Sequence, residues 1–101
     1  MPAATREGDA DVTHCSGMVR DEHSPDVLIN KIGNSRQGDH NTSHLLLTAN
    51  FCPPHTAPIT LGCPTVIVNG RGGGRVGDAI TSCTQVAEGS PNVFFGTKTG
   101  V

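Results

Sequence analysis

Apolar side chains along this chain are gathered in short runs that polar and turn-forming residues separate. Three of the runs share one pattern, namely "SPDVLIN" from Ser24, "CPTVIVN" from Cys63 and "SPNVFFG" from Ser90. Val, Ile and Phe are typical of strands, whereas the flanking Pro and the Asn or Gly are typical of turns. Because no stretch combines a helical period with helix caps, we predict an all-β chain of short hairpins.

A second pattern repeats in the polar segments: Arg-x-Gly-Asp, four further residues, and then His or Cys. It occurs as "TREGDADVTH", "SRQGDHNTSH" and "GRVGDAITSC", with the same offset from Asp to the last residue each time. We expect each glycine to lie at a sharp bend and each aspartate to accept hydrogen bonds from nearby backbone. The glycines and aspartates concerned are Gly8 and Asp9, Gly38 and Asp39, and Gly77 and Asp78.

The two patterns form one repeating unit, because the spacing from Ser24 to Arg36 equals that from Cys63 to Arg75. We name each unit after its last residue, as the His14, His44 and Cys83 units. The His14 unit is divided, since its apolar run follows Ser90 whereas its Arg-x-Gly-Asp lies near the beginning of the chain. A divided unit predicts that the two ends of the chain lie side by side and that the units close around a pseudo-three-fold axis.

Length and composition limit the fold to one small domain, residues 1–101. Leu, Ile, Val and Phe make up about a fifth of the residues, and Trp and Tyr are absent. So small an apolar core predicts an additional staple, which can be a disulfide, a metal or a partner. The net charge of −2 and the lack of a basic cluster argue against nucleic-acid binding.

The four cysteines point to metal ligation or free thiols more than to disulfides. The beginning of the chain has no apolar run, so we expect no signal peptide, and no segment has the length of a membrane span.

Equivalent residues of units that close around an axis converge, and so we expect His14, His44 and Cys83 to meet. Imidazole and thiolate groups suit Zn²⁺, which takes four ligands in a tetrahedron. The connection from the His44 unit to the Cys83 unit is the longer one and contains "FCPPHTAP", in which His55 is our fourth expected ligand. Four protein ligands leave no position for water, so we predict a structural zinc site rather than a catalytic one.

Two residues are alternative ligands. Cys52 lies near His55, and His40 shares a loop with His44. We otherwise expect His40 and His23 to be surface residues.

The remaining cysteines fit other roles. Cys15 follows His14 directly and would point the opposite way in an extended segment. Cys63 takes the place that serine has at positions 24 and 90, so we expect a small buried residue.

Enzyme interpretations find little support in the sequence. A Cys/His pair could act as nucleophile and base, but no third orienting group stands at a recognisable spacing. The glycine-rich "GRGGGRVGD" lacks the Gly-Lys-Ser/Thr ending of a phosphate-binding loop. We therefore predict that the protein is not an enzyme.

The motifs together resemble those of the PAAR-repeat family, over essentially the whole chain from Pro2 to Phe95. They are the opening "MPAA", the repeated Arg-x-Gly-Asp and "SPxVxxN" patterns, and the His/His/His/Cys set. Two local departures are Thr5, which separates Ala4 from Arg6, and the Cys-Ser pair after His14, where the family often has Gly-Gly.

The resemblance implies a small conical domain of β-hairpins with a structural zinc, more than an iron, near its apex. Such a domain caps and sharpens the trimeric β-helical spike of a contractile injection machine and helps to pierce the target cell envelope. We expect one copy per spike trimer, a monomer when free, and only transient contact with the target membrane. The Val27, Val66 and Val93 runs are expected at the cone base, against the spike.

Two other functions compete with the spike tip. An adaptor that loads an effector or cargo onto the spike would show an apolar patch away from the base. A small zinc hydrolase would show three ligands and a bound water. The expected location is a phage virion, at the tip of the tail baseplate, or the bacterial cytoplasm followed by secretion with the type VI spike. Because the sequence ends at Val101, we expect a bare tip without a toxin domain.

Overall fold

The structure is a computed structural model that describes residues 2–13, 16–45 and 54–96. In these residues all regular secondary structure is β, which confirms the predicted all-β class. The strands pair two by two as antiparallel sheets, β1 with β2, β3 with β4 and β5 with β6. Their bounds are β1 (Leu28–Ile29), β2 (Ile32–Gly33), β3 (His44–Leu45), β4 (Pro54–His55), β5 (Cys63–Val68) and β6 (Arg71–Gly73). No helix able to cross a membrane occurs in the described ranges.

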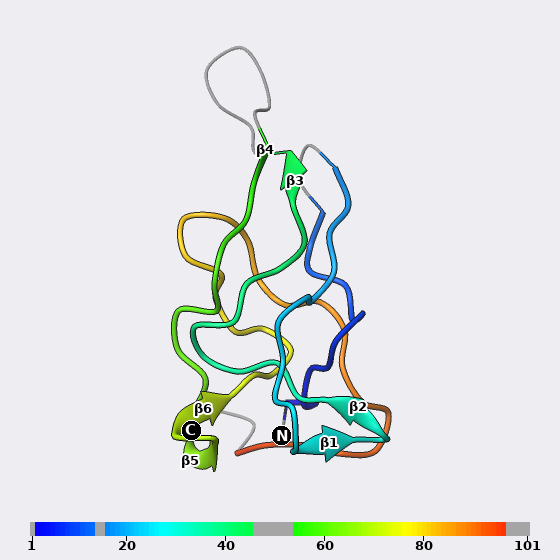
Figure 1. The fold of residues 1–101 in the computed structure, drawn as a ribbon, viewed down its shortest axis with the longest axis vertical. Coiled ribbons are helices and arrows are strands. Elements are labelled where there is room, and N and C mark those ends of the chain that lie inside the picture. Colours follow the sequence, from blue (N-terminus) through cyan, green and yellow to red (C-terminus); the bar gives the residue numbers. More distant parts are fainter. Residues whose placement is uncertain (1, 14–15, 46–53, 97–101) are drawn as a thin grey trace.

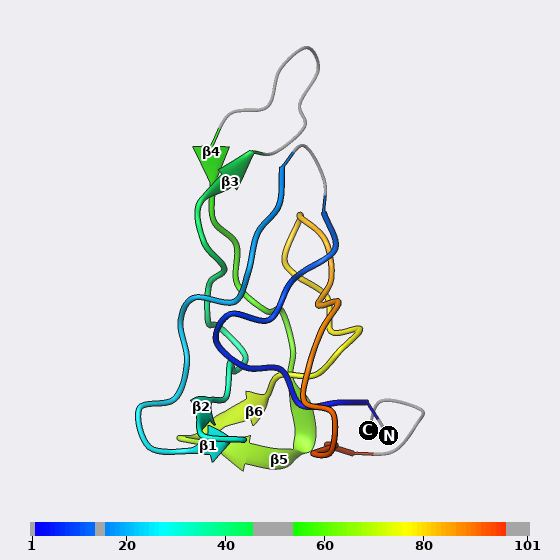
Figure 2. The same cartoon turned by 90° about the vertical axis from the view of Figure 1, so that its right-hand side faces the viewer.

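The strand pairs lie at the two ends of an elongated molecule (Figures 1 and 2). The pair β3–β4 marks one end, which we call the apex. At the opposite end, which we call the base, lie β1–β2, β5–β6 and residues 93–95. Long connections run between the two ends, and they are held by isolated β-bridges rather than by extended sheets.

Tight turns close the two hairpins of the base. Asn30 and Lys31 have φ angles of 54° and 69°, and Asn69 and Gly70 have φ angles of 53° and 79°. Positive φ at both central residues is typical of the two-residue turns that match the twist of paired strands. Asn tolerates this left-handed conformation better than other residues with a side chain, which explains its place in both runs.

The same asparagines join each hairpin to the neighbouring unit. The hydroxyl of Ser90 donates to the side-chain oxygen of Asn30, and the hydroxyl of Ser24 donates to that of Asn69. Each serine hydroxyl also accepts the backbone N–H three residues later. A single serine thus fixes its own turn and the tip of the next hairpin.

Cys63 takes the serine position in the Cys83 unit and is buried, as the sequence predicted. Its sulfur lies 3.2 Å from the hydroxyl of Thr65. Burial raises the pKa of the Cys63 thiol, but hydrogen bonds from the Thr65 hydroxyl and from the backbone of Thr65 and Val66 outweigh this effect, so the pKa lies below its ordinary value.

The Arg-x-Gly-Asp turns have the same geometry in all three units. The glycines have φ angles of 86°, 85° and 90°, and each aspartate accepts the backbone N–H of the arginine three residues earlier, at 2.8–2.9 Å. Each arginine also forms an ion pair with that aspartate, at 3.0, 2.8 and 3.0 Å. The expected bend and the expected aspartate–backbone bonds are both confirmed.

The divided unit is completed by the two ends of the chain. Ala3 forms an antiparallel bridge with Phe94, the N–H of Ala4 donates to the carbonyl oxygen of Val93, and that of Phe95 donates to the carbonyl oxygen of Pro2. The segment around Ala3 therefore lies beside the last apolar run, as predicted. The run itself makes an isolated bridge rather than a hairpin strand.

Two small clusters of buried apolar residues lie in the described part of the chain. The cluster at the base consists of Ala4, Ile29, Cys63 and Phe95, with Val66 and Val93 packed against it. The second cluster consists of Ala57, Ile59, Ile80 and Val86, with Val76 and Cys83 packed against it. Because the apolar core is small, polar contacts such as the aspartate turns must provide much of the order.

We predict that Asp39→Ala destabilises the fold by about 2–4 kcal/mol. Asp39 is almost fully buried and accepts hydrogen bonds from the backbone and guanidinium of Arg36 and from Arg71, all of which would lose their acceptor. Urea unfolding followed by circular dichroism measures the change. The exposed Asp21 is the matched control, for which the expected change is within about 0.5 kcal/mol. Equal losses in both variants would contradict a structural role for the turn.

Leu61 stands at a position where the other two units have a glutamate. Glu22 and Glu88 each accept a backbone N–H, from His40 at 2.7 Å and from Ala10 at 2.9 Å. Both glutamates stand two residues before the small residue that opens the run, where the Cys83 unit has the exposed Leu61.

Leu61→Glu is accordingly expected to stabilise the protein by about 0.5–1 kcal/mol, since it supplies an equivalent acceptor for the backbone of the Cys83 unit. Leu61→Lys is the control, because it removes the same exposed apolar side chain without adding an acceptor. Thermal unfolding of both variants decides the matter, and a gain shared by Lys would assign the effect to the lost apolar surface.

Candidate metal centre

The candidate site lies at the apex, where the strand pair β3–β4 meets the end of the Cys83 unit. His44 and His55 are directly opposite each other in the register of β3 and β4. Cys83 follows Ser82, whose φ of 50° turns the chain sharply after the third Arg-x-Gly-Asp segment. The potential ligand atoms of His44, His55 and Cys83 all lie within 4.8 Å of one another.

The distances within this cluster fit the corners of a tetrahedron. The Cys83 sulfur lies 3.2 Å from Nε2 of His44 and 3.4 Å from Nε2 of His55. Zinc bonds of about 2.0–2.1 Å to nitrogen and about 2.3 Å to sulfur place tetrahedral ligands about 3.3–3.6 Å apart. The two imidazole rings stand edge to face rather than stacked, with centroids 4.3 Å apart. The donor set and its spacing therefore suit a tetrahedral metal ion.

A hydrogen bond fixes which nitrogen of His44 can bind a metal. Nδ1 of His44 lies 2.8 Å from the carbonyl oxygen of Thr42. A carbonyl oxygen only accepts, so Nδ1 carries the proton and donates it, which leaves a lone pair on Nε2 toward Cys83. Such a bond to the second ring nitrogen is the usual way in which a protein orients a histidine ligand.

The surroundings of Cys83 raise the pKa of its thiol. Burial, followed by the negative charge of Asp11, raises the pKa of Cys83, whereas a hydrogen bond from the side chain of Asn41 and the positive charge of Arg20 lower it in part. A thiol with a raised pKa stays protonated at neutral pH unless a cation replaces its proton.

The structure brings together three of the predicted ligands, namely His44, His55 and Cys83. The fourth, His14, and the alternative Cys52 lie outside the described residues, as does Cys15.

The other histidines lie away from this cluster. His40 is partly exposed and bonds Glu22, at 2.8 Å, and His23 lies 3.7 Å from Glu7. Both therefore behave as the surface residues that the sequence predicted.

Sequence reasoning missed Asn41, a buried residue whose side chain donates to Oδ2 of Asp11 and accepts the backbone N–H of Ala57. Asn41 stands two residues after the aspartate of its unit, at the position that Asp11 and Ile80 take in the other two units. A comparison of this position across the units could have singled out Asn41. Two of the three residues there are polar, and all three stand three residues before an expected ligand in the sequence.

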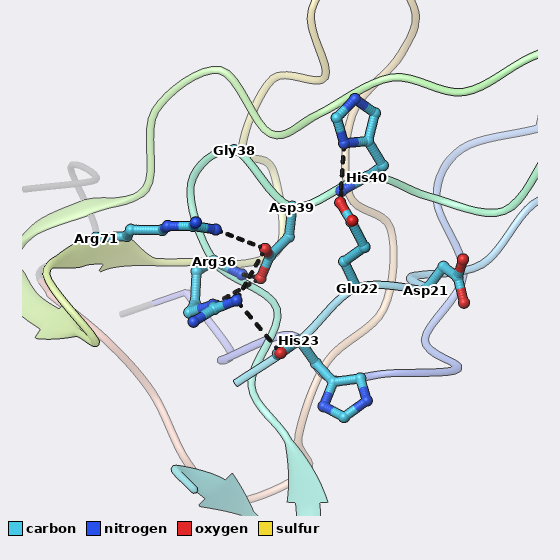
Figure 3. Close-up of a pocket in the computed structure, with 8 residues that line it drawn as sticks. All are labelled: Asp21, Glu22, His23, Arg36, Gly38, Asp39, His40 and Arg71. Atoms are coloured by element: carbon cyan, nitrogen blue, oxygen red, sulfur yellow. Dashed lines mark hydrogen bonds and ion pairs between the residues drawn. The ribbon is translucent and has the colours of Figure 1, made fainter. Parts of the chain in front are cut away.

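A groove of about 480 Å³ lies on the flank, and none of the three clustered residues lines it. Figure 3 shows two sets of charged groups that bind one another: Arg36 and Arg71 both contact Asp39, and His40 contacts Glu22. These pairs belong to the Arg-x-Gly-Asp turn and its surroundings, so we assign the groove a structural role.

Comparison with protein families gives one match, to the PAAR motif, over residues 50–99. The matched segment contains β4, the Arg-x-Gly-Asp turn of the Cys83 unit and two of the three clustered residues, His55 and Cys83. A search of curated proteins found no match. The repeated turns, the cluster at the apex and the family match agree, and residues 50–99 of the chain carry a PAAR motif.

Proposed function

We propose that this chain is a structural spike tip, which caps and sharpens the trimeric β-helical spike of a contractile injection machine and helps to pierce the target envelope. PAAR-motif proteins form a spike-tip family of such machines, and the family is structural rather than enzymatic. The observation that carries the proposal is the meeting of His44, His55 and Cys83 at the end of the molecule opposite the apolar base.

The metal in this proposal is Zn²⁺, in preference to iron, and its ligands are His14, His44, His55 and Cys83. Two imidazoles and a thiolate at tetrahedral spacing support zinc, and a fourth protein ligand closes the site to water. A closed site is structural, because it ties together segments that are far apart in the sequence. At the apex these segments are the β3–β4 pair and the end of the Cys83 unit.

The proposed docking surface is the base. The middle residue of each apolar run faces solvent there, with Leu28, Ile67 and Phe94 being 56%, 61% and 45% exposed. The last residue of each run, by contrast, is buried. One exposed apolar residue from each unit supports a conical, pseudo-three-fold cap, of which a single copy meets three identical spike subunits.

Free chains are monomers in this proposal, because the three docking positions belong to one chain. The protein reaches its place either in a phage virion, at the tip of the tail baseplate, or from the bacterial cytoplasm with the type VI spike. Contact with the target membrane is transient and ends once the spike has passed.

The metal assignment is tested with Cys83→Ser. We expect about one zinc per chain in the natural protein, and loss of the metal with a destabilisation on the order of 3–5 kcal/mol in the variant. Elemental analysis with protein quantification, followed by urea unfolding, measures both quantities. Cys63→Ser is the matched control, because serine already fills this position in the other two units, and it is expected to retain the metal.

Two results would contradict this ligand set. Full metal content in Cys83→Ser would make Cys52 the thiolate ligand. A natural protein that folds with far less than one metal per chain would remove the metal centre altogether.

The docking surface is tested with Val66→Asp, Val93→Asp and Ile67→Asp, each of which puts a charge into the base. We expect each variant to keep its zinc and to bind the cognate spike at least tenfold more weakly, since apolar contacts of the natural protein are lost. Val12→Asp is the control, because Val12 is 41% exposed but lies outside the base. Native mass spectrometry gives the stoichiometry, and a three-to-three complex or a homotrimer of this chain would refute the one-to-three cap.

A further inference from the structure

The Cys83 unit lacks a set of hydrogen bonds that the other two units share on the flank. In those units the glutamate, Glu22 or Glu88, and the residue before it both donate their backbone N–H to one carbonyl oxygen. The acceptor is His40 in one case and Ala10 in the other, at 3.0–3.3 Å. The glutamate carboxylate in turn accepts the backbone N–H of that same residue, at 2.7 and 2.9 Å. Each glutamate therefore bonds both the N–H and the carbonyl group of one residue.

Leu61 stands in place of the glutamate, and the Cys83 unit keeps only the first of these bonds. Thr60, the residue before Leu61, donates its N–H to the carbonyl oxygen of Ala79 at 2.9 Å. In the described part of the chain, the N–H of Leu61 and the N–H of Ala79 have no hydrogen-bond acceptor. Both residues are exposed, and Leu61, at 63%, is the most exposed of the large apolar residues described.

The two segments that carry these groups are nevertheless held against each other. Ile59 and Ile80 form an antiparallel bridge, and both side chains are almost fully buried. The hydroxyl groups of Thr60 and Thr81 lie 2.8 Å apart, within hydrogen-bond distance. The N–H of Ala79, next to Ile80, is therefore presented from a defined position on the flank.

The stability of the fold does not explain Leu61. A glutamate at this position would bond the N–H of Ala79, as in the other two units, whereas an exposed leucine gains little from burial. A single exposed leucine is common on protein surfaces, so its exposure alone carries no argument. The chain departs from its own repeat here, however, and the departure exposes an apolar side chain and a backbone donor together. Departures of this kind are typical of functional sites.

The flank around Leu61 also lacks charged residues. Residues 54–62 and 79–82 contain no Asp, Glu, Lys or Arg, whereas the equivalent flanks of the other units expose Asp21, Glu22 and Glu88. The central part of a protein–protein interface is typically depleted of charged residues. An acidic group of another molecule would meet no repelling carboxylate on these segments and could bond the N–H of Ala79.

We propose that the flank at Leu61 and Ala79 binds one partner protein, which packs an apolar surface against Leu61 and brings a carboxylate to the N–H of Ala79. This partner is not the trimeric spike. A three-fold partner requires similar residues in all three units, as Leu28, Ile67 and Phe94 provide at the base, whereas only the Cys83 unit has a leucine here. The inference rests on the proposed function only for this exclusion of the spike.

The partner is identified with a photo-reactive leucine analogue at position 61, introduced in the cells that make the protein. The same analogue at Val12, an exposed position outside this flank, gives the background. Capture only supplies the probe, namely the protein that crosslinks at position 61 but not at Val12. The purified probe is then titrated with the natural chain, Leu61→Glu and Val12→Glu. Native mass spectrometry gives the stoichiometry, and hydrogen exchange followed by NMR reports on the Ala79 amide.

We expect one copy of the probe per chain. Leu61→Glu should bind it about tenfold more weakly or worse, because its carboxylate accepts the Ala79 N–H and repels the acidic group of the probe. Since this variant is expected to be more stable than the natural protein, the loss of binding is separated from unfolding. Val12→Glu should bind within about twofold of the natural chain. In the complex the Ala79 amide should exchange about tenfold more slowly or less.

Several results would overturn the inference. One is the absence of a crosslink specific to position 61, and another is a crosslink only to the spike or to a second copy of this chain. Equal binding of the probe by the natural chain and Leu61→Glu, or an Ala79 amide that exchanges equally fast in the complex, overturns it as well. None of these results contradicts the spike tip, which is tested at the base. A spike that does not bind the natural chain contradicts the spike tip instead, because the flank is tested with the free chain.

Discussion

The aspartate of each Arg-x-Gly-Asp turn is the interaction on which the rest of the structure depends. One carboxylate closes the turn by accepting the backbone N–H of the arginine three residues earlier, and it also pairs with the guanidinium of that arginine. The turn sets the direction in which the chain leaves toward the apex. The His or Cys that ends each unit follows its aspartate at a constant offset in the sequence. The position of the turn therefore limits where that His or Cys can lie.

The molecule separates two kinds of chemistry along its length. Apolar runs gather at the base, where each run buries its last residue and exposes its middle one. Imidazole and thiol groups gather at the apex. The interior between them holds an apolar cluster as well as the buried ion pair of Asp11 with Arg20. Such a division fits the proposed spike tip, in which the base would dock and the apex would form the rigid point.

Much of this arrangement was predictable from the sequence. The apolar runs, the positive-φ asparagines and glycines, and the equal spacing from each Asp to His or Cys are local signals. They predicted the hairpins at the base, the bends at Gly8, Gly38 and Gly77, and the closure of the chain through Ala3 and Phe94. They also predicted the meeting of His44 with Cys83, since repetition around an axis brings equivalent positions together without any knowledge of side-chain packing.

The sequence by itself thus determined the repeating unit, its turns and the residues that converge at the apex. Only the tertiary structure decided that His55 faces His44 across a strand pair, that Asn41 bonds Asp11, and that Asp11 pairs with Arg20 in the interior. The physical reason is the range of the interactions. A turn depends on the conformations of a few consecutive residues, whereas these contacts join segments that become neighbours only when all three units pack together, and their partners are chosen by burial and by hydrogen-bond geometry that no local pattern contains.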